Sequence, residues 1–243
     1  MNSMYNGFAY IYDLLMKDVP YEIWADYIDS VLVQHLGENR HRHIVVDLAC
    51  GTGNITFPLA RKGWDMIGVD ISADMLSQAQ TKIDDEKILF LAQDMRELDL
   101  YGTVDAVICA CDGLNYILDE VELVSVFSRV KMFLNPGGVF IFDMNTEYKF
   151  KEIMGGKTFT APGYEWDNTY DLETGINKYH VIFTPDDSEP FEEVHYQRGY
   201  SNGLVQKLLH DAGFDLIDIK DNYNDSPPKD NCTRMVYIAV AKP

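Results

Sequence analysis

The sequence predicts an α/β fold in which helices cover both faces of a central, mostly parallel β-sheet. From residue 43 onward, short apolar runs rich in β-forming residues alternate with helical patterns. A glycine-rich turn follows the first of these runs, as in folds that bind a ligand at the end of a parallel sheet. With 243 residues, 47% of them hydrophobic, the chain can bury such a sheet. We therefore expect one Rossmann-like domain that spans residues 1–243.

Seven strands are expected in this sheet, and two of them come late in the chain. The expected strands are residues 43–49, 65–70, 87–92, 104–109, 138–143, 214–219 and 234–241. The helical spacing of Leu123, Phe127 and Val130 predicts a helix before the fifth strand, and the turn at residues 135–138 ends it. Another helix is expected over residues 204–212, before the last two strands.

The regular alternation breaks between residues 144 and 201, a stretch that is too long for an ordinary connection. Alternating side chains at residues 177–183 and 192–198 predict antiparallel strands, joined by a turn at residues 185–188. We therefore expect a small β subdomain, residues 144–201, inserted after the fifth strand.

The first 40 residues are expected to form a helical cover, with helices at about residues 5–16 and 21–36. No basic segment followed by an apolar stretch opens the chain, and no apolar run reaches membrane-spanning length. The four cysteines have no spacing typical of a disulfide framework or a metal site. We expect a cytoplasmic protein without a bound metal and without a membrane partner.

The charge of the chain argues against a nucleic-acid partner. Lys and Arg number 20 against 39 Asp and Glu, which gives a formal net charge of -19. A surface of this sign repels a phosphate backbone. The partners that we expect are a small molecule and, at most, a second copy of the chain in a homodimer; otherwise the protein is a monomer.

Three signals for ligand binding lie at the ends of consecutive expected strands. Gly51 and Gly53 follow the first strand, where they let a ligand approach the bare backbone. Asp70 ends the second strand, where its carboxylate can accept both hydroxyls of an adenosine ribose. Asp94 follows the third strand; taken alone it is a helix cap, but together with the others it favours an adenine contact. The three signals predict a cofactor that contains adenosine.

The run at residues 45–54 resembles the first motif of class I S-adenosylmethionine-dependent methyltransferases. Three other segments resemble the second motif, the third motif and the turn before the fifth strand of that family: residues 69–76, 93–95 and 135–138. The resemblance implies the seven-stranded methyltransferase sheet and S-adenosyl-L-methionine as cofactor. It also implies methyl transfer, for which a small-molecule nitrogen or oxygen acceptor is expected.

Carried over position by position, the resemblance implies a set of cofactor-binding residues at the strand ends. The methionine moiety would lie along the first motif, at Asp47, Ala49, Gly51 and Gly53. The adenosine would lie among residues that hold its ribose and surround its base, Asp70, Ile71, Met75, Asp94 and Met95. The floor would follow the fourth strand, at Cys109, Ala110 and Cys111. Tyr12 resembles an N-terminal tyrosine that closes over the cofactor in related small methyltransferases.

Methyl transfer depends mainly on position and dehydration, so a general base is needed only if the acceptor arrives protonated. The candidates for contact with the acceptor lie after the fourth strand and in the insertion: Asp112, Asn115, Tyr116, His180, His195 and Arg198. Asp112 can equally form a simple turn with Gly113. Strand alternation puts His195 and Arg198 on opposite faces, and either can instead pair with nearby carboxylates on a solvated sheet. The catalytic candidates are Asp112, His195 and Arg198.

Two alternative functions remain open at the level of the sequence. The first is an NAD-dependent oxidoreductase, because Asp70 would suit a dinucleotide ribose equally well. Thr56 stands where the dinucleotide-binding motif has its third glycine, which argues against it. The second is a non-catalytic regulatory protein that binds S-adenosylmethionine.

Overall fold

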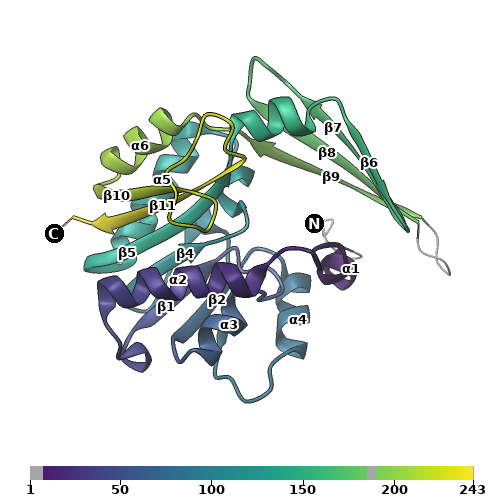
Figure 1. Ribbon diagram of the computed structural model, residues 1–243. Coiled ribbons are helices and arrows are strands. Elements are labelled where there is room, and N and C mark those ends of the chain that lie inside the picture. The colour runs from purple at the N-terminus through teal and green to yellow at the C-terminus, as the bar shows by residue number, and fades with distance from the viewer. Residues whose placement is uncertain (1–7, 185–189, 243) are drawn as a thin grey trace.

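The computed structural model describes residues 8–184 and 190–242 and has a seven-stranded sheet at its centre. The strands are β1 (Ile44–Leu48), β2 (Asp65–Asp70), β3 (Leu89–Ala92), β4 (Val104–Cys109), β5 (Leu134–Asn145), β10 (Phe214–Asp221) and β11 (Arg234–Ala241). Their order is β10-β11-β5-β4-β1-β2-β3, and only β11 runs antiparallel to its neighbours (Figure 1). The predicted Rossmann-like sheet is confirmed. Its five consecutive parallel strands bring their carboxyl ends to one edge.

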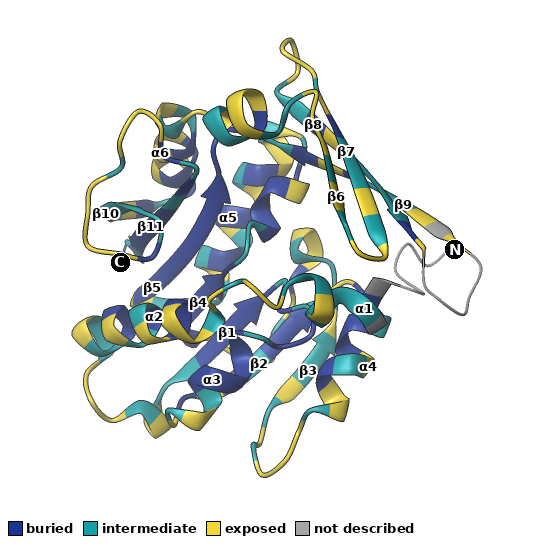
Figure 2. Ribbon diagram, turned by 45° about the vertical axis from the view of Figure 1, so that its right-hand side comes forward, coloured by how far each residue is buried: buried dark blue, intermediate teal, exposed yellow. Residues whose placement is uncertain are grey.

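Helices cover both faces of this sheet. The helices of the first face are α2 (Tyr21–Leu36) and α3 (Thr56–Arg61), and those of the second face are α5 (Glu120–Phe133) and α6 (Asn202–Asp211). On the first face Trp24, Ile28 and Leu32 pack against the strands, so α2 belongs to the core and is more than a cover. On the second face Phe127 packs against Phe140. The strands are accordingly buried between helices that expose their outer sides (Figure 2).

Polar caps fix where three helices begin. Ser72 accepts a hydrogen bond from the backbone N–H of Met75 and starts α4 (Ala73–Thr81) directly after β2. Asp119 caps α5 and Ser201 caps α6 in the same manner. Such a cap contributes about 1 kcal/mol to helix stability. The cap at Ser72 also sets the direction in which the chain leaves the carboxyl edge of the sheet.

A second, antiparallel sheet of four strands is inserted between β5 and α6. Its strands are β6 (Thr158–Ala161), β7 (Tyr164–Tyr170), β8 (Ile176–Phe183) and β9 (Phe191–Arg198). The strands expected at residues 177–183 and 192–198 are confirmed, whereas β6 and β7 were not expected. The turn expected at residues 185–188 lies outside the described residues. A π-helical segment, η4 (Lys149–Met154), connects β5 to this sheet.

The second sheet and the first helix lie on the same side of the core. Figures 1 and 2 show β6–β9 and α1 (Phe8–Leu15) beyond the same edge of the central sheet. The helix predicted at residues 5–16 is described from Phe8 onward, and residues 5–7 lie outside the described part. The carboxyl edge of the parallel strands is therefore flanked by two inserted or appended elements.

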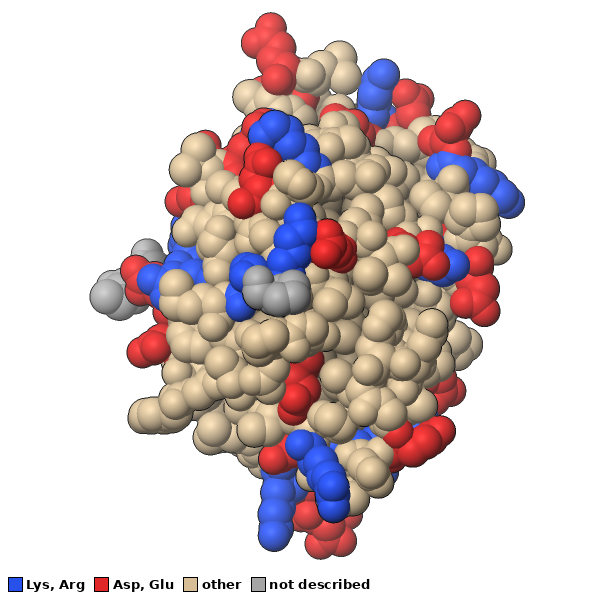
Figure 3. Space-filling model, turned by 90° about the vertical axis from the view of Figure 1, so that its left-hand side faces the viewer, with Lys and Arg blue, Asp and Glu red and all other residues tan. Residues whose placement is uncertain are grey.

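Two further features of the described residues concern their surroundings: the character of the helices and the distribution of surface charge. Among residues 8–184 and 190–242, no helix has the length and apolar character needed to cross a membrane. On the face shown in Figure 3, acidic and basic side chains lie side by side around broad uncharged areas.

Candidate active site

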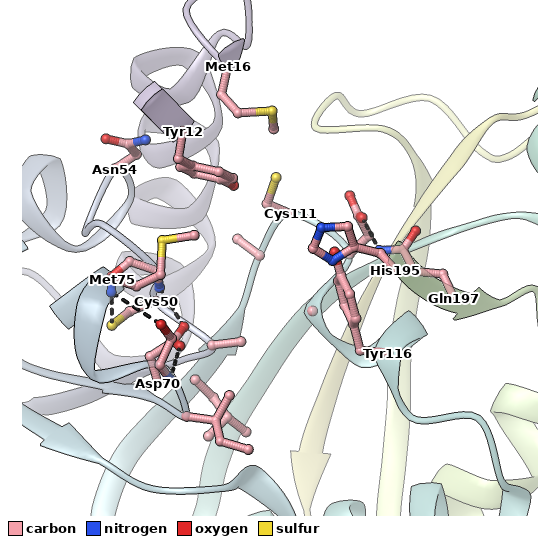
Figure 4. Close-up of a pocket in the computed structure, with 18 of the residues that line it drawn as sticks. Tyr12, Met16, Cys50, Asn54, Asp70, Met75, Cys111, Tyr116, His195 and Gln197 are labelled. Carbon is pink, nitrogen blue, oxygen red and sulfur yellow. Dashed lines mark hydrogen bonds between the residues drawn. The ribbon is translucent and has the colours of Figure 1, made fainter. Parts of the chain in front are cut away.

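A cavity of about 1080 Å³ lies at the carboxyl ends of the parallel strands, between α1 and the second sheet. Most of the residues predicted for the site line it: Tyr12, Asp47, Ala49, Gly51, Asp70, Ile71, Met75, Asp94, Met95, Cys111, Asp112 and His195. In Figure 4 the residues of the cofactor motifs lie on one side and His195, Tyr116 and Gln197 lie on the other, with Cys111 between them. The cavity can therefore hold two ligands that face each other.

The glycine turn after β1 presents bare backbone to the cavity. Ala49 and Gly51 have positive φ angles of 60° and 55°. A Cβ atom built on Gly51 would meet no atom within 4 Å, so the backbone at this position borders open space. An alanine in the left-handed region costs of order 1–3 kcal/mol, and such strain is typical of ligand-binding turns. The turn is shaped for a ligand that approaches the main chain closely.

Asp70 holds this turn in place with the same carboxylate that faces the cavity. Its Oδ2 accepts the backbone N–H of Gly51 at 2.8 Å, and its Oδ1 accepts the backbone N–H of Ser72 at 2.8 Å. Burial raises the pKa of Asp70, while these backbone hydrogen bonds lower it, with a net rise. The carboxylate of Asp70 is therefore already partly satisfied by the protein's own backbone. A carboxylate has about four acceptor sites, so two remain for a ligand.

The adenine side of the predicted site combines apolar walls with one capped carboxylate. Met75, Met95 and the half-exposed Ile71 line the cavity beside Asp70. Asp94 accepts the backbone N–H of Arg96 at 2.9 Å and pairs with its guanidinium at 2.6 Å. Burial raises the pKa of Asp94, but the hydrogen bonds from Arg96 lower it below its ordinary value. Asp94 is therefore both a cap and a charged group at the cavity wall.

Three residues predicted for the site do not line the cavity. Gly53 has a φ of 83°, and a Cβ there would come within 2.6 Å of the Phe57 ring, so this glycine serves the packing of α3. Cys109 is fully buried between the sheet and α5. Arg198 pairs with Glu120 at 2.8 Å, at the junction of the second sheet with the core. The structure thus places these three residues behind the cavity wall, in contact with their packing partners.

Helix α1 is fastened to the glycine turn through Asp13. Its Oδ1 accepts hydrogen bonds from the Thr52 hydroxyl at 2.6 Å and the Asn54 amide at 2.9 Å. Lys82, which follows α4, pairs with Asp13 Oδ2 at 2.5 Å and donates to Asn54 Oδ1 at 3.1 Å. This cluster holds Tyr12 over the cavity, where its ring is directed toward Cys111 (Figure 4). Asp13 was not singled out from the sequence.

A buried charge network fixes the turn after β4. Asp143, which has no exposed surface, accepts the backbone N–H groups of Cys111 at 2.7 Å and Asp112 at 2.9 Å. Asp143 also accepts hydrogen bonds from Tyr223 and from Arg234. Cys111 and Asp112 have positive φ angles of 60° and 56°, and the bonds to Asp143 stabilise this strained turn.

Asp112, a predicted catalytic residue, is committed to this network. Its Oδ1 accepts Arg234 Nη2 at 2.7 Å, and its Oδ2 accepts Gln197 Nε2 at 2.7 Å. The Arg234 guanidinium lies over the Trp24 ring, 4.9 Å from its centroid. Asp112 therefore links the central sheet to β9, and both of its carboxylate oxygens are engaged by protein donors.

The inner face of the second sheet completes the cavity with aromatic and polar side chains. The lining residues of β7, β8 and β9 are Tyr164, Trp166, Tyr179, Val181, His195 and Gln197. His195 is 5% exposed, its Nε2 lies 3.2 Å from Glu193 Oε2, and the Tyr116 ring meets it edge-on at 6.1 Å. The strand alternation that separates His195 from Arg198 thus turns His195 toward the cavity.

Of the other three residues expected to contact the acceptor, one lines the cavity and two do not. Tyr116 lines the cavity. Asn115 is fully buried, and its amide donates to the backbone carbonyls of Asn145 and Arg198, so it joins the core to β9. His180 does not line the cavity and pairs with Glu192 at 2.7 Å.

The residues of the cofactor side fit the chemistry of S-adenosylmethionine. The turn at Gly51 has room for a ligand against its backbone, Asp70 retains acceptor sites for hydroxyls, and the methionine side chains offer an apolar surface for a flat base. Together with the seven-stranded sheet, this site defines a class I S-adenosylmethionine-dependent methyltransferase.

Comparisons with known proteins identify the family. Residues 45–138 match the family model described as "Methyltransferase domain". The chain is 32% identical to "Putative methyltransferase YqeM" of Bacillus subtilis (strain 168), over 97% of this chain and 96% of the relative. The chain belongs to this family of S-adenosylmethionine-dependent methyltransferases, and S-adenosylmethionine is its cofactor.

Solved structures extend the likeness to the whole fold. An S-adenosylmethionine-dependent methyltransferase from Clostridium acetobutylicum ATCC 824 is 32% identical, with a TM-score of 0.87 and coverage of 98% of this chain and 99% of that chain. The amino pentose methyltransferase CalS10 from Micromonospora echinaspora, solved with its cofactor, is 17% identical with a TM-score of 0.74, over 96% of each chain. The second likeness concerns the fold alone.

Proposed function

We propose that this methyltransferase acts on a small molecule whose nitrogen or oxygen atom accepts the methyl group between Cys111 and the inner face of the second sheet. The observation that carries the proposal is the shared cavity: the glycine turn and Asp70 line one side, and Trp166, Tyr179 and His195 line the other. A cavity of about 1080 Å³ suits a cofactor with a small acceptor better than a macromolecule. The acidic surface disfavours nucleic acid.

Amine acceptors are consistent with what some relatives are named for. A glycine/sarcosine N-methyltransferase from Halorhodospira halochloris is 25% identical over 84% of this chain and 82% of the relative. CalS10, a neighbour in fold, is described as an amino pentose methyltransferase. These names support a small nitrogen acceptor as the first class to test.

We propose the following roles for the residues that line the site. S-adenosylmethionine, when bound, supplies the methyl group. The positions that would hold it are the turn at Ala49 and Gly51, with Asp70 on the ribose, while Tyr12 excludes water above. Holding acceptor and donor in line can contribute about 7–11 kcal/mol to lowering the barrier.

His195 is the proposed proton acceptor. His195 Nε2 lies 3.2 Å from Glu193 Oε2, and a proton held on Nε2 beside this carboxylate would leave Nδ1 as the basic atom. Glu193 would orient the ring and stabilise the imidazolium that forms. We favour His195 over Asp112, because Asp112 is paired with Arg234.

The test uses methyl-labelled S-adenosylmethionine with fractionated small metabolites and detection of labelled product by mass spectrometry. On the acceptor so found, His195→Ala is expected to lower kcat by about 10²–10⁴-fold, the usual contribution of a general base. S-adenosylhomocysteine affinity should stay within a few-fold of wild type. Tyr196→Ala is the matched control, since Tyr196 is 47% exposed on the opposite face of β9. Equal turnover of the two variants would remove His195 from the mechanism.

A further inference from the structure

Lys149 places an ammonium group at the wall of the cavity. Its backbone is fixed, because the Lys149 N–H donates to the Thr146 hydroxyl at 3.2 Å and the next residue, Phe150, is fully buried. The side chain lines the cavity, and its Nζ donates to the amide oxygen of Asn145 at 2.8 Å. A lysine ammonium has three donors, so this single contact leaves donors directed to the cavity.

The carboxylates near Lys149 are already matched to other donors. Both oxygens of Asp112 are engaged by Arg234 and Gln197, and Asp143 is engaged by Arg234, Tyr223 and two backbone N–H groups. Over residues 8–184 and 190–242, no carboxylate lies within ion-pair distance of Lys149 Nζ. Asp112 and Asp143 act on the Lys149 ammonium at longer range, so an arriving anion would supply the direct ion pair that Lys149 lacks.

Arg234 lines the same cavity, but its charge, unlike that of Lys149, is engaged in ion pairs. Its guanidinium forms ion pairs with both Asp112 and Asp143 and lies over Trp24. The Asp112–Arg234–Asp143 cluster carries one more negative than positive charge, and Lys149 brings the local sum to zero. A carboxylate ligand could therefore pair with Lys149 while the cationic sulfonium of the cofactor offsets the charge that it adds.

We propose that Lys149 binds a carboxylate in this cavity and that the methyl acceptor carries it, which makes the acceptor a small amino or hydroxy acid. The acceptor part of this inference rests on the proposed function. Lys149 follows β5, whereas the expected cofactor contacts follow β1, β2, β3 and β4 or, for Tyr12, lie on α1. The cofactor also has a carboxylate, so the experiment must separate the two sources.

The first measurement is calorimetry on wild type, Lys149→Met and Lys151→Met. Lys151 is the matched control, because it lies in the same π-helical segment with its side chain 55% exposed. The ligands are S-adenosylhomocysteine and 5′-methylthioadenosine, which lacks the carboxylate. We expect Lys149→Met to bind both within about threefold of wild type. A loss of about tenfold or more for S-adenosylhomocysteine alone would assign the carboxylate to the cofactor and overturn the acceptor as its source.

The second measurement is the thermal shift of the protein saturated with S-adenosylmethionine, which carries the sulfonium, in sodium acetate and in sodium chloride of equal ionic strength. We expect acetate to raise Tm above chloride in wild type, Lys149→Arg and Lys151→Met, and to lose this effect in Lys149→Met. The carboxylate site is refuted if acetate equals chloride in wild type while S-adenosylhomocysteine affinity does not depend on Lys149. Neither measurement needs turnover, so a failure here is distinct from a failure of His195→Ala to affect methyl transfer.

Discussion

At the scale of single residues, Asp70 holds the glycine turn and is proposed to bind the ribose of the cofactor, so one substitution should affect both. Asp70→Ala removes the acceptors for Gly51 and Ser72 as well as those for ribose hydroxyls. Hydrogen bonds to a charged group are worth about 1.5–3 kcal/mol each, so we expect cofactor binding to weaken by at least about tenfold, measured by calorimetry with S-adenosylhomocysteine. The N–H groups left without Asp70 should also lower stability modestly.

Asp65→Ala is the control for Asp70, because Asp65 is exposed at the opposite end of the same strand. It should leave S-adenosylhomocysteine affinity unchanged. If Asp70→Ala binds as wild type does, then Asp70 serves only the turn.

Asp47 makes the stability of the protein depend on pH. Burial raises its pKa to about 7, although the Thr56 hydroxyl, which donates at 2.5 Å, opposes this rise. In the unfolded chain Asp47 releases its proton near pH 4. The folded state therefore holds more protons between about pH 4 and pH 7, and its stability falls as pH rises through this window, by on the order of 4 kcal/mol.

Asp47→Asn should remove this dependence, since an amide does not titrate. We expect the variant to gain stability relative to wild type between pH 5 and pH 8, measured by urea unfolding of the cofactor-free protein. Asp65→Asn should show no such gain. A stability difference between Asp47→Asn and wild type that is the same at both pH values would contradict a raised pKa.

The site residues that the sequence predicted lie in local motifs, whereas the site residues that it did not predict lie outside any motif. Gly51, Asp70 and Asp94 stand at strand ends within recognisable local motifs. Lys149 and Arg234 follow no motif, and Arg234 meets partners 91 and 122 residues away. Apolar periodicity locates strands, but it does not say which polar residues of distant strands will pair. The buried network could therefore be found only in the folded chain.

At the scale of elements, the attachment of α1 through Asp13 offers a direct test of closure over the cofactor. Its hydrogen bonds to Lys82, Thr52 and Asn54 lower the pKa of Asp13 despite the opposing effect of burial, so it is charged at neutral pH. Asp13→Ala should loosen α1, with faster hydrogen exchange over residues 8–15 and faster dissociation of S-adenosylhomocysteine.

Asp18→Ala controls for this change, because Asp18 is exposed just after α1. It should leave both the exchange and the dissociation rates at their wild-type values. Unchanged exchange in Asp13→Ala would mean that apolar packing, and not this charge cluster, holds the helix.

Strands β6 and β7 escaped prediction for a reason that concerns their function. The inner face of β7 lines a cavity rather than a core, so Tyr164 and Trp166 stand where a packed sheet would have aliphatic residues. Alternation of apolar and polar residues is consequently weak along β7. The core strands β2 and β4 were placed with their observed bounds, because both their faces are buried under helices.

At the scale of the whole molecule, cofactor binding should stabilise the folded state by mass action. At a concentration one hundred times its Kd, a ligand adds about 2.7 kcal/mol, which corresponds to about 5–10 °C in Tm for a chain of this size. We expect this shift with S-adenosylhomocysteine. NAD should give none, since Thr56 is buried against Asp47 where a dinucleotide fold needs glycine. A comparable shift with NAD would contradict the discrimination that we expect.

Strand β11 is synthesised long after its neighbour β5, and this order affects how the protein folds on the ribosome. Arg234 forms ion pairs with both Asp112 and Asp143, yet it leaves the ribosome long after them: at about 5–20 residues per second, the 91 residues after Asp143 take roughly 5–18 s. Throughout this interval the nascent core has an open edge at β5 and two carboxylates without their counter-ion. We expect the emerging chain to remain hydrated at this spot and to recruit chaperones until β11 docks. Assembly of the catalytic pocket would thus be the last event of folding.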